Sequence, residues 1–147
     1  MRRFPLNAEL QVGACMAMGQ LGSSEMRVKR KAASGGVMSL LVVAMDRHPQ
    51  HAQAQRWACA ALRHLSSNSH ENKTFIAKKG GVERLCETGR RFLGMEALVV
   101  TEALGTLCHL ASKHPENKQY MFEVGALELT LEALSGQVEA ELAMAGC

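Results

Sequence analysis

Hydrophobic side chains recur at helical spacing along the middle of the chain, in segments bounded by glycine, serine and proline. The segment at residues 49–66 carries an apolar stripe that is made of Ala58, Cys59, Leu62 and Leu65. Pro49 suits the first turn of such a helix, because proline lacks only a donor that would be unpaired there. We therefore predict a long helix with this stripe against the core.

Two shorter apolar segments follow the long one. The first, at residues 70–79, stops at Gly80, which can adopt the left-handed conformation of a helix cap. The second, at residues 82–88, is a predicted third helix that presents Val82, Leu85 and Cys86 at helical spacing and ends near Gly89. The same plan of one long and two short helices is predicted again, in the segments 96–112, 115–124 and 126–134.

Self-similarity at a fixed interval indicates that these segments form a repeat. Six residues recur about 44 positions later: Met1, Pro5, Ala8, Gln11, Ala14 and Cys15 become Met45, Pro49, Ala52, Gln55, Ala58 and Cys59. A second interval of about 45 residues carries Glu71-Asn72-Lys73 to Glu116-Asn117-Lys118, and Gly80 to Gly125. A unit of this size cannot bury its own apolar faces, so the stacking of units must supply the core.

The repeat predicts a single domain over residues 1–147, with units at about 1–44, 45–89 and 90–134 and a partial fourth unit at 135–147. The chain begins at the entrance to a long helix and ends within the next equivalent one. We therefore expect a fragment of a longer array, because solenoids normally carry polar capping units at their ends. Uncapped ends also predict apolar surface that is exposed, or covered by another chain in self-association, at Ala14, Cys15, Met18, Leu134 and Leu142.

Three stretches of the sequence resemble the armadillo repeat family. They are ENKTFIAKKGGV at 71–82, ENKQYMFEVGAL at 116–127 and WACAALRHL at 57–65. These stretches match the family's Asn-containing short helix, glycine junction and Ala/Leu-rich third helix. The resemblance implies an all-α fold, namely a right-handed α-solenoid of about three three-helix repeats, with HEAT-like repeats as the near alternative. It also implies a protein-interaction scaffold and not an enzyme.

In armadillo proteins the third helices line a concave groove that grips an extended peptide, often through a repeated Trp and an Asn one turn later. At the matching positions this sequence has Met16, Ala60 and Gly105 for the Trp, and Gln20, His64 and His109 for the Asn. The absent Trp side chains argue against recognition of nuclear signals, because they would stack on lysines. The resemblance predicts a partner-binding groove built from Val12, Met16, Gln20, Arg56, Ala60, His64, Thr101, Gly105 and His109. Small side chains at two of these positions should leave room for a peptide or helix of a partner protein.

The sequence offers no candidate catalytic, cofactor or metal-binding residue. The five cysteines, Cys15, Cys59, Cys86, Cys108 and Cys147, show no C-x-x-C spacing, and we expect each to be a reduced, buried side chain. His64 and His109 recur in register, but helices packed about 8–10 Å apart would hold them too far apart to share a zinc ion. Phosphate-binding, dinucleotide-binding, hydrolase and zinc-protease motifs are absent from the sequence. A helical-repeat enzyme is the least favoured alternative.

Charge adds one further alternative. The net charge is +3, and the run from Arg27 to Lys31 resembles a nuclear localisation or phosphate-contacting patch, although a solvated helix face is the simpler explanation. Together with Lys73, Lys78 and Lys79 it defines the alternative of a nucleic-acid or nuclear accessory module.

The sequence contains no secretory signal and no apolar run of membrane-spanning length. We therefore expect a cytoplasmic or nuclear protein.

Overall fold

The computed structural model describes residues 7–22, 27, 29–31 and 36–145, and side chains only as far as 136. The described residues are α-helical and contain no strand, which confirms the all-α class. The helices are α1 (Ala8–Gly22), α3 (Val37–Arg47), α4 (Ala52–Ser66), α5 (His70–Lys78), α6 (Gly81–Phe92), α7 (Ala97–Ala111), α8 (Pro115–Glu123) and α9 (Ala126–Ala145). None of these helices has the length and apolar character that a membrane crossing requires.

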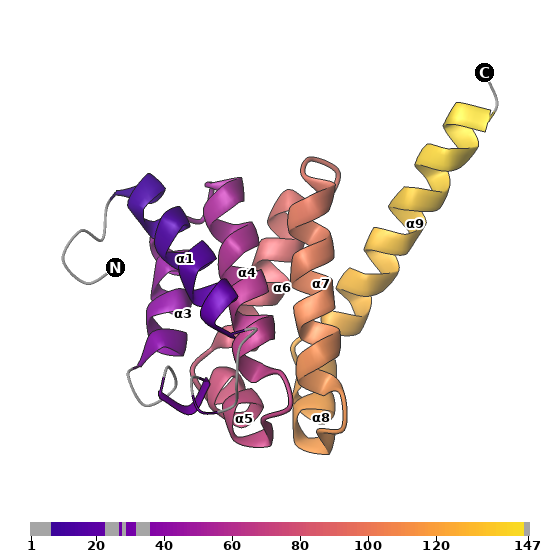
Figure 1. The fold of residues 1–147 in the computed structure, drawn as a ribbon. Helices are drawn as coiled ribbons and strands as arrows, with labels where there is room; N and C mark the ends of the chain where they lie inside the picture. The colour runs from indigo at the N-terminus through magenta and orange to yellow at the C-terminus, as the bar shows by residue number, and fades with distance from the viewer. Residues whose placement is uncertain (1–6, 23–26, 28, 32–35, 146–147) are drawn as a thin grey trace.

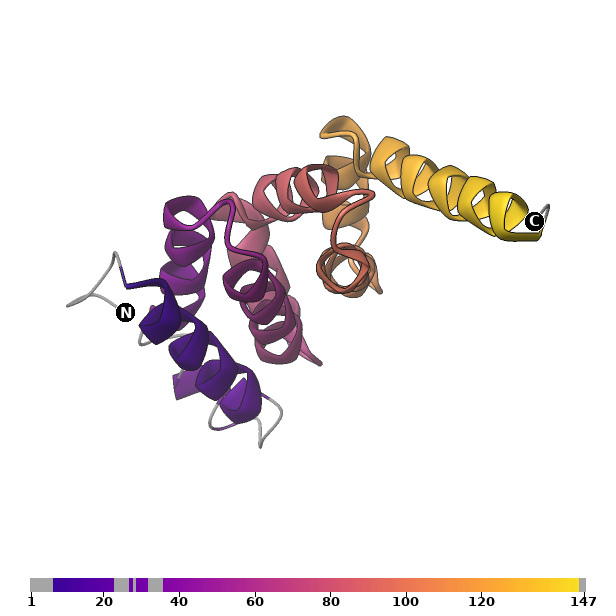
Figure 2. The same ribbon diagram turned by 90° about the horizontal axis from the view of Figure 1, so that it is seen from above.

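The three helices α1, α4 and α7 lie side by side in one row, with α4 in contact with both of the others (Figure 1). A second row, α3 and α6, packs behind them, and the start of α9 continues it (Figure 2). The short helices α5 and α8 lie together at one end of the rows. The second half of α9 extends away from the other helices in both views.

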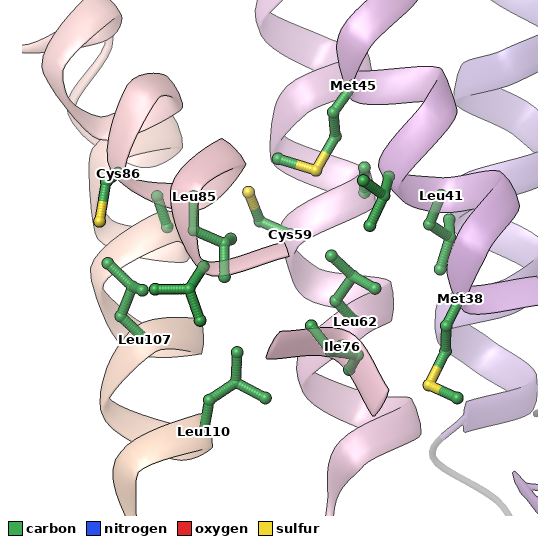
Figure 3. Packing of buried hydrophobic residues seen from close by; sticks show 14 of the residues in the cluster. Met38, Leu41, Met45, Cys59, Leu62, Ile76, Leu85, Cys86, Leu107 and Leu110 are labelled. Atoms are coloured by element: carbon green, nitrogen blue, oxygen red, sulfur yellow. The ribbon is translucent and has the colours of Figure 1, made fainter. Parts of the chain in front are cut away.

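One hydrophobic core runs through both rows of helices (Figure 3). The predicted stripe of α4 is buried within it, because its four members are at most 1% exposed: Ala58, Cys59, Leu62 and Leu65. The predicted apolar face of the third helix is buried as well, and consists of Val82, Leu85 and Cys86. Both predicted faces are therefore confirmed as core surfaces.

Two buried asparagines close the turns that follow the long helices. The Asn72 Nδ2 donates to the carbonyl oxygen of Leu65 at 2.8 Å, and the Asn117 Nδ2 donates to that of Leu110 at 3.1 Å. A buried polar group that lacks such a partner costs about 1–3 kcal/mol, so these bonds fix where each short helix begins. Asn72 and Asn117 are the asparagines of the two ENK motifs.

Two lysines satisfy the carbonyl groups at the ends of the long helices. The Lys29 Nζ donates to the Ser67 carbonyl at 3.2 Å, and the Lys73 Nζ donates to the Ser112 carbonyl at 2.7 Å. Both lysines are buried, at 7% and 8% exposed. Cations are favourable at helix C-termini, so each lysine links one short helix to the next long helix along the row.

The start of α4 differs from the prediction. We expected Pro49 in the first turn, whereas the helix begins at Ala52 and Pro49 lies in the preceding turn. The His51 side chain caps the helix by accepting from the Ala54 amide, and the Gln55 Nε2 donates to the carbonyl oxygens of Met45, in α3, and of His48, which follows α3. These bonds set the start of the helix. Pro5, the matched proline, lies outside the described residues.

Two predicted helix ends are wrong. The helix that should end near Gly89 continues to Phe92, and Gly89 lies buried inside α6. A Cβ atom there would lie 2.6 Å from Leu129 Cδ2, so this glycine permits close packing of α9 and does not stop the helix. The last predicted helix, 126–134, is likewise longer, because α9 runs without a break to Ala145. Gly80 does take the predicted left-handed conformation, with φ 78°.

Candidate binding surface

The nine predicted groove residues lie on the three helices of the front row, three on each. Side chains at i, i+4 and i+8 point to the same side of a helix, so each helix presents its three residues together. Exposure varies among them: Met16, Gln20 and Thr101 are exposed, Ala60 is buried, and Val12, Arg56, His64, Gly105 and His109 are half-buried. The surface is therefore partly open and partly closed by neighbouring side chains.

An ion pair occupies the space between α4 and α7. The Arg63 Nη2 lies 2.8 Å from Glu102 Oε2, and the Arg63 Nη1 lies 3.3 Å from the position of a Cβ on Gly105. The room expected beside Gly105 is thus taken by a guanidinium on its α4 side. Sequence reasoning missed this contact, since Arg63 does not belong to the predicted set.

The two histidines of the set are neutral at physiological pH. Burial is the main cause that lowers the pKa of His64 and of His109, and the neighbouring cations Arg63 and Lys73, respectively, lower it further. The Nε2 atom of His109 is buried and has no hydrogen-bond partner among the described residues. These side chains offer polar contacts but no fixed charge.

The open part of the surface lies on the far side of α7, away from α4. A hollow of about 550 Å³ opens there between α7, α8 and α9. We call it the α7–α9 groove, and its lining includes Thr101, Leu104, Gly105, Cys108, Leu127 and Thr130. Two residues of the predicted set, Thr101 and Gly105, therefore line a hollow, and the other seven do not line it.

An apolar stripe on α9 extends from this groove. Leu127, Leu131 and Leu134 are 49–57% exposed and follow the i, i+4, i+7 spacing of one helix face. The predicted exposure is confirmed at Leu134 and is wrong at Cys15, which is fully buried. Ala14 and Met18 are half-buried, and the side chain of Leu142 lies outside the described residues. The spacing of the three leucines is visible in the sequence, but exposure is predicted there only for Leu134.

The thiols divide into two kinds. Burial raises the pKa of Cys15 and of Cys86 to about 11 and that of Cys59 still further, so these thiols are unreactive. Cys108 is exposed, which corrects the expectation that every cysteine is buried. Because Cys108 lines the α7–α9 groove, it is a natural chemical reporter of that surface. Cys147 lies outside the described residues.

The basic run is only partly available for binding. Lys29 lies inside it but is buried against the Ser67 carbonyl, and Lys73 is buried in the same way. Arg27, Arg30 and Lys31 are exposed. Burial of these two lysines weakens the nucleic-acid alternative, because a lysine that satisfies a backbone carbonyl is not free to contact phosphate.

No family model, no curated protein and no solved structure matches the chain. The assignment of a function therefore depends on the geometry of the described residues.

Proposed function

We propose that this chain is an armadillo-type α-solenoid that binds an amphipathic or apolar segment of another protein along the α7 side of the α1–α4–α7 row. The role is one of binding and not of catalysis. A cytoplasmic or nuclear location belongs to the same proposal. HEAT-like repeats are the alternative description of the fold.

The solenoid part of the proposal is supported by bonds that recur at the interval of the sequence repeat. Asn72 and Asn117 make the same bond to the preceding long helix, and Lys29 and Lys73 make the same bond to the next one. Gly80 and Gly125 both have left-handed backbone angles, with φ 78° and φ 76°. Equivalent residues thus make equivalent contacts, as expected for stacked units.

The binding part is carried by one observation, which is that the α7–α9 groove and the exposed leucines of α9 form adjoining apolar surfaces. Soluble proteins rarely expose a contiguous apolar surface without a partner for it. The two threonine hydroxyls of the groove donate to carbonyls of their own helices, Thr101 to Ala97 and Thr130 to Ala126. The lining therefore favours aliphatic or aromatic side chains of a partner over charged ones.

A peptide selection tests this proposal. Random peptides displayed on phage are selected on the intact chain and on the double variant Thr101→Arg/Cys108→Arg, which places two cations on exposed positions of the groove. We expect apolar or amphipathic peptides to be enriched on the natural chain and lost on the variant, because an apolar segment cannot cover unpaired charges without a desolvation cost.

The matched control adds the same kind of charge elsewhere. Gln119→Arg changes an exposed side chain of α8 that lies outside the groove lining and next to Glu123, with which it can pair. This variant should keep the full set of enriched peptides, and circular dichroism should show that all variants remain helical. Equal enrichment on the groove variant and on the natural chain would exclude the groove as the binding surface.

A further inference from the structure

A second hollow, of about 490 Å³, lies between α5 and α8. His70, the first residue of α5, and His114, the residue that caps α8, stand in its wall together with Glu116 and Glu83. The imidazole rings of His70 and His114 stack with centroids 3.9 Å apart and planes 6° apart. Two imidazoles from different helices and two carboxylates therefore line one hollow.

Three of these side chains present metal-ligand atoms to one another. One atom each from His70, His114 and Glu116 lies within 4.8 Å of the other two. The argument that excluded zinc at His64 and His109 concerned side chains on neighbouring long helices. It does not apply here, because His70 and His114 stand at the beginnings of their helices, where neighbouring chain segments bring side chains into direct contact.

Hydrogen bonds fix which nitrogen of His114 carries the proton. The Thr74 hydroxyl donates its one proton to the His70 carbonyl at 3.1 Å, so it accepts from His114 Nε2 at 2.9 Å. His114 Nδ1 in turn accepts from the Asn117 amide at 3.3 Å. The ring of His51 caps α4 in the same way, with Nδ1 accepting from Ala54 at 3.3 Å. His114 Nδ1 therefore bears the lone pair of the ring, which accepts from the Asn117 amide and which a metal ion would have to take over from that amide.

This lone pair lies next to a second acceptor. The Glu116 Oε2 is 3.2 Å from His114 Nδ1, and two acceptors at that distance repel each other unless a cation or a proton lies between them. A proton needs only those two atoms, whereas here a ligand atom of His70 also lies within 4.8 Å of one from each of the other two residues. The His70 ring is stacked on that of His114, so it must turn before both imidazoles can face one ion. The Glu83 Oε2 in the same hollow is buried without a hydrogen-bond partner in the described part of the chain, while its Oε1 accepts from the Tyr120 hydroxyl. Lys78 also lines the hollow but is exposed.

We propose that His70, His114 and Glu116 bind a divalent transition-metal ion of the zinc class, with a fourth position open to the hollow. Two imidazoles and one carboxylate are an established ligand set for zinc with an open site. Bonds of about 2.0–2.2 Å place tetrahedral ligand atoms about 3.4 Å apart, so the present atoms must close by about 1.4 Å at most. His70 and Glu116 are exposed and can rotate to do so.

Thr74 supplies the supporting contact that such a site needs. Metal-bound histidines nearly always donate their other ring N–H to an oxygen, which fixes the ring orientation, and His114 already donates to Thr74. Because His70 belongs to α5 and the other two ligands to α8, the ion links two short helices across the interface between units. The site is separate from the α7–α9 groove and does not depend on the proposed partner.

The test measures binding of Zn²⁺ by calorimetry and of Co²⁺ by its visible spectrum, using the full chain. Helix α5 is capped by a serine, because the Ser69 hydroxyl accepts from the Asn72 amide. The variant His114→Ser gives α8 the same type of cap, so it removes the metal ligand and keeps a capping side chain. We expect one equivalent of Zn²⁺ on the natural chain, and a loss of affinity of more than about 100-fold in His114→Ser and in His70→Ala. Thr74→Val should lose about 10–100-fold, the range typical of a supporting partner.

His51→Ser is the matched control, because it replaces a capping histidine that is not part of the cluster. This variant should bind Zn²⁺ like the natural chain, and the Co²⁺ complex should lack the charge-transfer absorption of thiolate ligands. The absence of binding at micromolar Zn²⁺, an equal loss in the control, or a thiolate spectrum would each overturn the proposal. If His114→Ser does not fold, His70→Ala decides, because His70 is exposed.

Discussion

The unit of α4, α5 and α6 and the unit of α7, α8 and α9 share internal bonds but differ in their surroundings. Each contains the buried asparagine that donates back to its long helix, and each begins its third helix after a left-handed glycine. The helix α4 is covered by α1 on one side and by α7 on the other, whereas α7 has α4 on one side and the α7–α9 groove on the other. The shared positions therefore hold each group of three helices together, and the neighbouring helix decides which face stays exposed.

The third helices, α6 and α9, also differ in their surroundings. Helix α6 ends at Phe92, which is buried beside Val99, and Gly94 then turns the chain with φ 74°. At the matching positions of α9, 45 residues later, the sequence has Gln137 and Glu139. Without an apolar residue and a turn glycine at these positions, α9 continues as one helix to Ala145.

The largest expected loss of stability is for a substitution in the covered helix α4, compared with one in the α7–α9 groove. Leu62→Ala removes a fully buried side chain of α4 and should lower the free energy of unfolding by about 2–5 kcal/mol. Leu127→Ala, on a half-exposed side chain of the groove, should cost less than about 1 kcal/mol. Urea unfolding followed by circular dichroism measures both. Equal losses would mean that the groove is closed in solution, and the comparison between the units would fail.

Removal of the shared asparagine bond should lower the free energy of unfolding by the same amount in both units. Asn72→Ala and Asn117→Ala each leave a buried carbonyl without its donor, so each should lower the free energy of unfolding by about 1–3 kcal/mol. Gln119→Ala, at an exposed position of α8, is the control and should stay within about 0.5 kcal/mol. A loss at only one of the two asparagines would show that the units are not equivalent.

The difference between the third helices predicts that two glycine substitutions change the free energy of unfolding in opposite directions. Gly136→Ala lies in exposed helix with nothing within 4 Å of the new Cβ, so it should raise the free energy of unfolding by about 0.5–1 kcal/mol. Gly94→Ala, in a left-handed turn, should instead lower it by at least that amount. Thermal unfolding of the two variants checks the prediction. A destabilised Gly136→Ala would place a turn inside α9.

The smallest effect concerns pH and the matched histidines of α4 and α7. The folded state lowers the pKa of His64 and of His109 below 6.5, mainly through burial, so the unfolded chain takes up protons first as the pH falls. Stability should therefore be constant above neutral pH and decrease as the pH falls through 6.5. Replacing both histidines by glutamine should weaken the pH dependence of urea midpoints measured between pH 7.5 and pH 5. A part should remain, because burial also lowers the pKa of His114. An unchanged slope in the double variant would assign the pH dependence to other groups.

Local patterns in the sequence were sufficient to predict the helical class, the buried stripes and most helix ends. They could not predict that Gly89 lies inside a helix, because its role depends on Leu129 approaching from α9. The histidine cluster was missed for a similar reason, since His70 and His114 are 44 residues apart and meet only when α5 and α8 pack together. Arg63 covers Gly105 through a contact between helices that the spacing of residues does not reveal.

The most direct test of the binding surface is the reaction rate of Cys108 with a thiol-reactive probe, measured in a Cys147→Ser variant with and without a peptide selected on the natural chain. Cys108 is exposed in the groove, whereas Cys15, Cys59 and Cys86 are buried, so fast labelling reports on the groove. The proposal predicts that labelling slows in proportion to the fraction of chain bound by peptide. A rate that stays the same when the peptide saturates the chain would contradict it.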